Sequence, residues 1–307
     1  MIALFLFACQ VEETKMTRST STKTQPSEYI VDQSDWEEVS AQFNLEDIEQ
    51  QLAEIIPSLR SFNAAPILSS YQDVMSYADS YCPANYEDNG NSFWYGECES
   101  DAGMTYNGYL SYNTYEDMDF FGDGGSWDVS VISGAADMLY PEEHRVHWGG
   151  AAYLAEGTSP DGYPVFFSLL NGSFLDQNQE GWIADGYNSN LMLYGISFDS
   201  IQVGAKALSV EGALNTEGTI SAVEFNGLLH YPTAIGFPCE EEPLGTIGIR
   251  TEDGFWLDLE FDIKEDWSMS GDCDGCGIAS HKGEEIGEIC INISSLVDWE
   301  ERPWSTY

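Results

Sequence analysis

The sequence predicts a mainly β protein: a large curved antiparallel sheet, either a sandwich or an open barrel, preceded by a small helical N-terminal element. Three observations support this fold class: short runs that alternate apolar and polar residues, glycines inside those runs, and turn-forming residues between them. The clearest run is 255–263, where the apolar residues share one face and Trp256 and three acids share the other. Because side chains alternate sides along a strand, this pattern buries one face and exposes the other. A parallel strand would instead read as a continuous apolar run.

Alternating runs recur between residues 104 and 293 and predict the strands of the sheet. We expect these strands near 104–114, 127–132, 145–154, 164–175, 190–203, 205–214, 219–230, 245–250, 255–263, 277–281 and 286–293. Gly108, Gly172, Gly212 and Gly227 interrupt several of them at unequal intervals, so the sequence contains no true repeat. A glycine inside a strand usually marks a bulge or bend, which predicts that the sheet curls.

Helical periodicity precedes the strands. Between Asn44 and Pro57 the aliphatic residues recur at helical spacing, which predicts an amphipathic helix. Asn44 can cap its start, and Pro57 predicts its end. A shorter pattern over 69–82 predicts a second helix that stops at Pro83.

The charge balance limits the partners of the protein. The chain of 307 residues carries 53 Asp and Glu against 10 Lys and Arg, a formal net charge of -43 at pH 7. Such a field repels phosphates, so we exclude nucleic acid as a partner. It attracts cations and basic partners, although solubility alone also explains it. The hydrophobic share of 43% is sufficient for a sizeable core.

The N-terminus predicts export and a lipid anchor. Residues 1–8 are apolar but too few to span a bilayer, which needs about 20 residues, so we interpret them as a signal-peptide remnant. Leu6-Phe7-Ala8-Cys9 resembles the lipobox of bacterial lipoproteins, although no basic segment precedes it and the resemblance covers these four positions alone. It implies that Cys9 is lipidated and, because Gln10 follows rather than aspartate, that the protein is anchored in the outer membrane, on its periplasmic or surface face. The alternative is an apolar cluster beside a free thiol.

This interpretation sets the domain boundaries. Residues 10–28 are polar and nearly free of apolar side chains, so they cannot offset the entropy of ordering and should form a flexible tether. We therefore assign 1–8 to the signal-peptide remnant, 9–30 to the lipid anchor and tether, 31–84 to the helical element and 85–307 to a disulfide-braced antiparallel β domain.

Six cysteines remain once Cys9 is set aside, and an even number in an exported chain predicts three disulfides. Proximity in the sequence favours the pair Cys82–Cys98, and among the pairings open to the other four cysteines we favour Cys239–Cys273 and Cys276–Cys290. The segment 273–276 also has the spacing of a redox or zinc pair, but an oxidising compartment favours disulfides.

One loop has the composition of a calcium site. It offers oxygen ligands at the first, third and fifth positions and glycine at the sixth, as an EF-hand loop does. The oxygen-bearing residues are Asp176, Asn178, Glu180 and Asp185. Tyr187 stands at the twelfth position, where the bidentate glutamate belongs, so Asp185 would have to substitute for it. A polar hairpin turn is the alternative.

Asp258, Glu260 and Asp262 share one face of the run 255–263. Paired carboxylates are the groups that glycosidases use as acid and nucleophile. The row resembles the acidic strand of the laminarinase-type jelly-roll hydrolases, although that motif has Glu at both ends where this row has Asp. The row therefore predicts either a glycoside hydrolase or lyase or simply a solvated face.

The remaining candidates are aromatic residues and histidines. Trp94, Trp127, Trp148 and Trp182 lie near expected turns, where exposed rings could stack on sugars. His144 and His147 are three apart, which favours two surface histidines over a metal pair. No Gly-x-Ser-x-Gly elbow, zinc-protease motif or phosphate loop occurs. We expect a cell-envelope lipoprotein that acts as a non-enzymatic binding or structural module toward glycan, protein or lipid, with the hydrolase or lyase as the alternative.

Overall fold

The computed structural model describes residues 41–61, 75–88, 91–141, 144–176, 187–199, 203–232 and 237–299. The chain divides into two units, Met1–Ala41 and Gln42–Tyr307. All of the elements below belong to the second unit.

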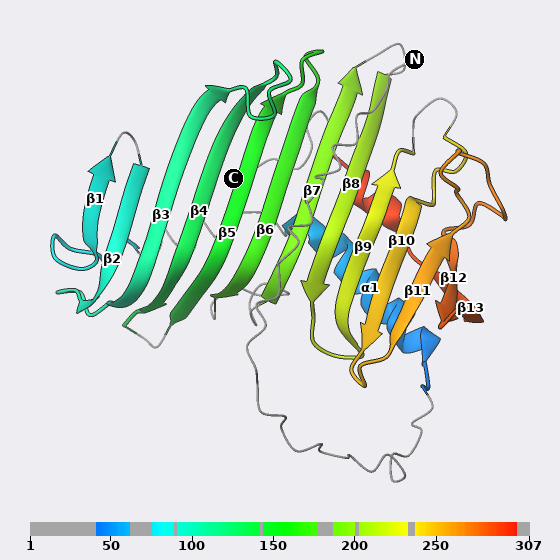
Figure 1. The fold of residues 1–307 in the computed structure, drawn as a ribbon, viewed down its shortest axis with the longest axis horizontal. Helices are drawn as coiled ribbons and strands as arrows, with labels where there is room; N and C mark the ends of the chain where they lie inside the picture. The colour runs from blue at the N-terminus through cyan, green and yellow to red at the C-terminus, as the bar shows by residue number, and fades with distance from the viewer. Residues whose placement is uncertain are drawn as a thin grey trace, which may run out of the picture. The chain divides into compact units, whose positions relative to one another are not determined.

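Within the described residues, 13 strands form one antiparallel sheet in which each strand pairs with the next along the chain (Figure 1). The strands are β1 (Ala84–Asp88), β2 (Asn91–Glu99), β3 (Thr105–Met118), β4 (Ser126–Leu139), β5 (Arg145–Thr158), β6 (Pro164–Asp176), β7 (Tyr187–Asp199), β8 (Val203–Asn215), β9 (Ile220–His230), β10 (Leu244–Thr251), β11 (Trp256–Phe261), β12 (Cys276–His281) and β13 (Glu284–Cys290). The predicted fold class is confirmed, and the sheet is open because β1 and β13 do not pair with each other.

Strand β11 shows how the sequence defines the two faces of the sheet. Its buried residues are Leu257, Leu259 and Phe261, each at most 1% exposed. Trp256, Asp258 and Glu260 alternate with them and are exposed. The register extends this alternation to the other strands, so the whole sheet has one apolar face and one face that is more mixed.

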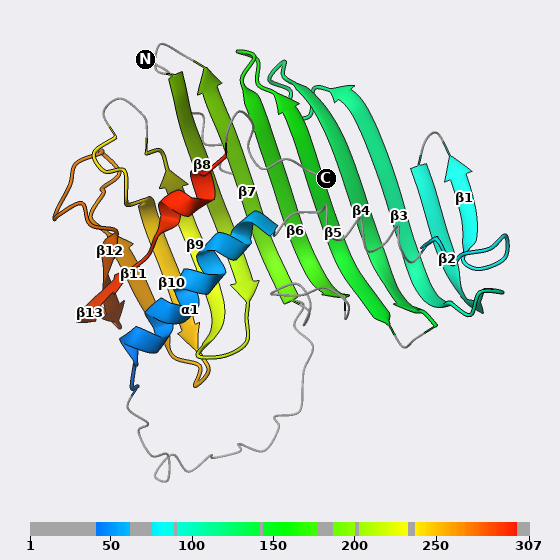
Figure 2. The ribbon, with the colours of Figure 1, turned by 180° about the vertical axis from the view of Figure 1, so that it is seen from behind.

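Helix α1 (Leu45–Ser58) covers part of the apolar face, and it confirms the helix predicted between Asn44 and Pro57 (Figure 2). Its predicted end signals are wrong, because the side chain of Asn44 makes no capping bond and Pro57 lies inside the helix. Its buried residues are Ile48, Leu52, Ile55 and Ile56, and they join the main core of the sheet. The short helices η2 (Leu59–Ser61) and η3 (Ile293–Val297) follow α1 and β13 respectively. We call this side of the sheet the helix face and the other side the second face.

The side chain of Gln51 fixes α1 against the turn between β8 and β9. Its Oε1 accepts the backbone N–H of Ile220 at 2.8 Å, and its Nε2 donates to the carbonyl of Glu217 at 2.7 Å. These bonds satisfy backbone groups that the turn leaves without ladder partners. The contact joins residues more than 160 positions apart in the chain.

The first part of the second predicted helix, 69–74, lies outside the described residues, and the part from Ser76 to Cys82 forms turns and bends instead of a helix. The reason is local, because the carboxylate of Asp79 accepts the backbone N–H groups of Tyr81 at 2.7 Å and Cys82 at 2.9 Å. Such side-chain bonds compete with the helical pattern. Among the described residues, no helix combines the length and the apolarity needed to cross a membrane.

Glycines on successive strands allow close approaches of the backbone that other residues would prevent. Gly108, Gly134, Gly150 and Gly172 have φ values between +123° and +151°, a region that side chains rarely adopt. Gly150 pairs with both Gly134 and Gly172. A Cβ on Gly150 would lie 2.1 Å from the carbonyl oxygen of Asn171, so only glycine allows the strands to approach this closely.

A smaller apolar cluster lies on the second face near the β3–β4 turn. Trp127 and Phe167 are its largest buried side chains, at 1% and 8% exposure. Phe121 from the turn packs against both rings, with centroid distances of 4.9 Å and 5.3 Å. This turn therefore covers one end of the second face, and the opposite ends of β3–β6 carry polar residues instead.

Candidate functional site

The polar end of the second face begins with exposed aromatic rings on β2 and β3. Tyr95 and Tyr109 are register partners, so their side chains adjoin on the same face, and they are 49% and 48% exposed. Phe93 stacks against Tyr109 with ring centroids 6.3 Å apart and planes inclined by 27°. We call Phe93, Tyr95 and Tyr109 the tyrosine platform.

The four tryptophans named from the sequence do not form this surface. Trp127 and Trp148 are each 1% exposed, one in the second-face cluster and one in the main core. Trp94 is half-buried, and its carbonyl accepts a hydrogen bond from the hydroxyl of Tyr106 at 3.2 Å. Trp182 lies outside the described residues. The exposed rings at this end of the sheet are therefore tyrosines, which sequence patterning did not separate from buried aromatics.

Beside the platform the sheet surface carries small side chains. The register row that contains Tyr109 continues through Ala135 on β4 and Gly149 on β5 to Ser173 on β6. Two strand spacings separate Tyr109 from Gly149, or about 10 Å. The surface between the rings of the platform and Ser173 is therefore formed by a methyl group and a bare backbone.

Polar side chains on three adjacent strands form a hydrogen-bonded chain at the edge of this surface. Arg145 donates from Nη2 to Oδ1 of Asp137 at 2.7 Å, and His147 Nδ1 bonds the same oxygen at 3.1 Å. Ser173 Oγ lies 3.4 Å from the other ring nitrogen of His147, Nε2. The side chains of His147 and Asp137 are 32% and 45% exposed, so solvent and ligands can reach them.

The neighbours of Asp137 determine its protonation state and the tautomer of His147. The Arg145 guanidinium, assisted by His147, holds the pKa of the Asp137 carboxyl below its usual range against a smaller opposing effect of burial. An ionised carboxylate only accepts hydrogen bonds, so Nδ1 of His147 carries the proton. In the neutral ring Nε2 is then an acceptor, and the hydroxyl of Ser173 donates to it.

The two histidines flagged in the sequence do not meet. His147 belongs to β5, whereas His144 precedes the strand and its ring packs on Tyr140 with centroids 4.3 Å apart. Sequence spacing could not indicate the true partners of His147, because Asp137 and Ser173 are 10 and 26 residues away. Only the register of β4, β5 and β6 brings these three residues together.

The Asp258 row lies on the second face at the other side of the sheet. Asp258 and Glu260 are exposed on β11, and Lys264 donates to Glu260 at 2.7 Å. Asp262 lies just beyond the strand, and its carboxylate accepts the hydroxyl of Ser270 at 2.7 Å. Two of the three carboxylates are thus engaged with surface neighbours. This arrangement is the one expected of a solvated face rather than of carboxylates at the floor of a cleft.

The proposed calcium ligands cannot be placed. Asn178, Glu180 and Asp185 lie outside the described residues, and only the backbone of Asp176 is described, at the end of β6. Among the residues that the structure does describe, no group of three or more His, Cys, Asp or Glu side chains could hold a metal ion. Calcium binding therefore stays a prediction of the sequence.

Among the described residues three disulfides brace the domain, and they join the pairs favoured in the sequence analysis. The bonds are Cys82–Cys98, Cys239–Cys273 and Cys276–Cys290. Cys273 and Cys276 bond to different partners, so the segment 273–276 is neither a redox pair nor a zinc site. The bond Cys276–Cys290 joins β12 to β13 at a pair of register partners. The bond Cys239–Cys273 joins the loop before β10 to the loop before β12.

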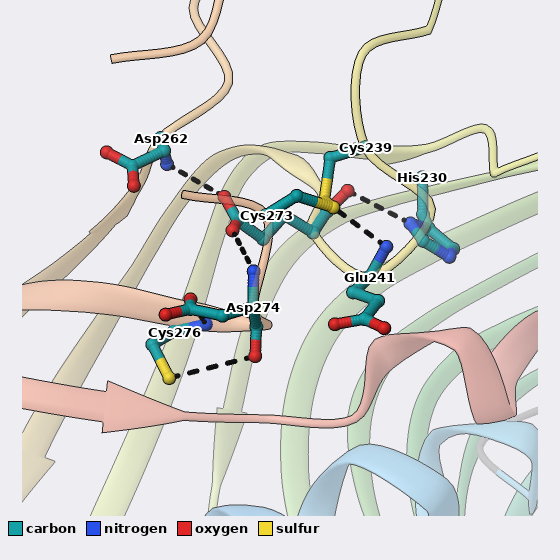
Figure 3. The surroundings of a disulfide bond; sticks show 8 residues. His230, Cys239, Glu241, Asp262, Cys273, Asp274 and Cys276 are labelled. Atoms are coloured by element: carbon teal, nitrogen blue, oxygen red, sulfur yellow. Dashed lines mark hydrogen bonds between the residues drawn. A yellow bond between two sulfur atoms is a disulfide. The ribbon is translucent and has the colours of Figure 1, made fainter. Parts of the chain in front are cut away.

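A polar cluster surrounds the Cys239–Cys273 bond (Figure 3), and two of its members, Glu242 and His230, are buried. The side chain of Glu242 is fully buried and accepts the backbone N–H groups of Asp262 at 3.0 Å and Asp274 at 3.2 Å. Burial raises the pKa of Glu242, and these two bonds oppose that rise. Glu242 thus holds two loops to the end of the sheet, and its place in a run of acids gave no sign of this role.

His230 lies in the same cluster and is 1% exposed. Its Nδ1 bonds the backbone carbonyl of Glu242 at 3.3 Å, whereas its Nε2 is buried and has no hydrogen-bond partner. Burial lowers the pKa of His230 to about 4, because the protonated ring would lose its solvation. His230 is therefore neutral in the folded protein near neutral pH.

Neither protein-family models nor curated proteins nor solved structures gave a match to this chain. Its function is therefore inferred from the chemistry of its own residues. The arrangement with the clearest chemical character is the tyrosine platform with the adjoining chain of Asp137, His147 and Ser173.

Proposed function

We propose that this protein is a lipoprotein of the bacterial outer membrane whose β domain acts as a module that binds a glycan on the second face of the sheet. Cys9 would carry the lipid, and residues 9–30 would tether the domain to the membrane. The loop that contains Asp176 would bind calcium as an accessory site. The module would act by binding, without chemistry at the Asp258 row.

The observation that carries this proposal is the tyrosine platform beside hydrogen-bonding side chains. A tyrosine ring offers a flat apolar face on which the C–H groups of a sugar can stack. Asp137, His147 and Ser173 offer both donors and acceptors that could bond its hydroxyl groups. A few polar groups that converge beside an apolar surface are typical of ligand sites.

The net charge narrows the class of glycan. A chain with a formal charge of -43 repels anionic polysaccharides, whereas a neutral glycan experiences no such repulsion. We therefore expect the ligand to be an uncharged oligosaccharide or polysaccharide.

Isothermal titration of the full chain with a panel of neutral oligosaccharides tests the binding. Tyr109→Ala should weaken binding about tenfold, which corresponds to about 1.4 kcal/mol. The matched control is Tyr115→Ala, since Tyr115 lies on the same strand and face with 41% exposure but outside the platform. No binding by the wild type, or equal losses in both variants, would contradict the proposal.

The anchor and the calcium loop have separate tests. Metabolic labelling with a fatty-acid analogue should mark the wild type but not Cys9→Ser. If neither protein is labelled, the proposed lipid anchor is wrong. Calorimetry with millimolar calcium should show heat that the double variant Asp176→Asn/Glu180→Gln lacks. If the oligosaccharides are cleaved and Glu260→Gln abolishes cleavage, the hydrolase alternative replaces the binding module.

A further inference from the structure

We infer that Ser173 is a nucleophile toward carboxylic esters, with His147 as its base and Asp137 as the residue that orients the base. This activity goes beyond the proposed glycan binding, and it gives a chemical role to the three residues that the binding proposal uses only as hydrogen-bonding groups beside the tyrosine platform. It would make the second face a site that both holds a ligand and removes an acyl group.

The order of the contacts is the one that serine hydrolases use. Asp137 Oδ1 bonds Nδ1 of His147 at 3.1 Å, and Ser173 Oγ lies 3.4 Å from Nε2. The carboxylate selects the tautomer whose Nε2 can accept the serine proton. A nucleophile, a base and an orienting group in hydrogen-bond sequence define this chemistry whatever the fold or the sequence order.

The structure also leaves space for the reacting ester. A Cβ built on Gly149 would lie 3.5 Å from both Nε2 of His147 and Oγ of Ser173, and the nearest further atom is the Cβ of Ala135 at 3.9 Å. Because residue 149 is glycine, this point carries no atom of the protein. An ester carbonyl placed there is close to both the nucleophile and the base, as an acyl-transfer site requires.

The proposed reaction balances as an ester hydrolysis. Oγ of Ser173 attacks the carbonyl carbon while His147 Nε2 takes the hydroxyl proton, and the bond to the alcohol oxygen breaks. The proton passes from His147 to that oxygen, so the alcohol leaves and an acyl-serine remains. Water then attacks the acyl-serine with the same histidine as base, which releases the carboxylic acid and restores the hydroxyl.

The surroundings indicate a small acyl group and a slow reaction. The surface beside Ser173 is an open sheet formed by Ala135 and Gly149, so the acyl group meets little of the protein. The backbone N–H groups of β5 pair with β4 and β6 on either side and are not available to an oxyanion. The substrate class that fits is a short-chain ester, such as an acetyl group on a sugar that rests on the tyrosine platform.

The test uses the full chain, with its disulfides intact, and p-nitrophenyl acetate as the probe. Wild-type protein should release p-nitrophenolate, and mass spectrometry after acid quenching should find an acetyl group on the peptide that contains Ser173. Ser173→Ala should lower the rate at least tenfold and abolish that acetyl group. The matched control is Ser133→Ala on β4, because Ser133 lies on the same face and its hydroxyl lies 2.8 Å from the hydroxyl of Ser111, away from His147.

A second variant keeps the test decisive if Ser173→Ala fails to fold. Gly149→Ala meets no atom closer than 3.5 Å, so it should fold normally while its methyl group fills the space for the ester and slows acetylation. If Ser173→Ala hydrolyses the ester at the wild-type rate, or if only other residues are acetylated, the inference is wrong. Direct catalysis by the His147 imidazole would then explain the activity. The hydrolysis of p-nitrophenyl acetate and the calorimetric titration with oligosaccharides are separate measurements, so failure of one proposal is distinguishable from failure of the other.

Discussion

The buried His230 makes a specific prediction about acid stability. Its pKa falls from 6.5 to about 4 on folding. Between these two pH values the imidazole of residue 230 is protonated in the unfolded chain but not in the folded chain. The contribution of His230 to the free energy of unfolding is therefore fully present above pH 6.5 and is lost as the pH falls toward 4. A difference of about 2.5 in pKa corresponds to about 3 kcal/mol at 1.36 kcal/mol for each pKa unit.

The perturbation is His230→Asn. The asparagine Nδ2 can replace the Nδ1 donor to the carbonyl of Glu242, a bond of 3.3 Å in the wild type, but it does not titrate. The free energy of unfolding should be measured by urea denaturation at pH 7, 6, 5 and 4 for both proteins with disulfides intact. We expect the stability advantage of the wild type over the variant to shrink by about 3 kcal/mol between pH 7 and pH 4.

Comparison of the wild type with His230→Asn cancels the contributions of the other titrating groups to the pH dependence of stability. The pKa of Glu242 is raised, so its contribution is present at low pH and is lost as the pH rises, which is the opposite sign. Glu242 remains in both proteins, as do the other acidic residues. His281→Asn controls for the substitution itself, because His281 bonds the backbone carbonyl of Trp256 at the surface, at 2.6 Å. Parallel pH profiles for wild type and His230→Asn would refute the reasoning.

Three further predictions concern the framework. Gly150→Ala should destabilise the protein by at least about 2 kcal/mol, since its Cβ would clash with the backbone, whereas Gly149→Ala next to it should be nearly neutral; equal midpoints in thermal unfolding would contradict this. Replacing Cys82 and Cys98 together by alanine should cost about 3 kcal/mol in chemical denaturation, because the bond closes a loop with a sequence separation of 16, and an unchanged midpoint would argue against it. Glu242→Gln should cost about 1–3 kcal/mol, because its amide group cannot accept the second backbone N–H; a variant as stable as wild type in urea would count against the assigned role.

The sheet was predictable because its strands carry their own local signals. In β11 the alternation of apolar and acidic residues gives both the strand and its buried face. Lys282 and Gly283 form the turn between β12 and β13, and both residues have positive φ, as a tight turn of this kind requires. The local pattern predicts the structure at these places because each strand has one buried and one solvent-exposed face, which makes apolar and polar residues alternate.

Other strand limits were hidden from the sequence. Strand β4 extends to Leu139, beyond the predicted 127–132, through a segment rich in small residues that shows no clear alternation. There the glycine at 134 and its neighbours are set by close approach to adjacent strands rather than by hydrophobicity. Strand β1 is absent from the strands expected from the sequence, and pairing with β2 makes it a strand.

The candidate site was not predictable at all as a unit. Asp137, His147 and Ser173 follow no motif, since their proximity depends on the register of three strands. A shift of one residue in that register would send one of them to the helix face. Residue types in the sequence therefore identified His147 as a surface residue but could not identify its partners.

Footprinting with hydroxyl radicals tests the central claim most directly, namely that the polar end of the second face is the ligand-binding surface. The full chain would be oxidised with and without the neutral glycan that gives the strongest calorimetric signal, and protected residues would be identified by mass spectrometry. We predict protection of Tyr95, Tyr109 and His147, with Trp256 and Tyr115 oxidised equally in both samples. Protection centred on Trp256 and the Asp258 row, or no protection at the tyrosine platform, would contradict the account.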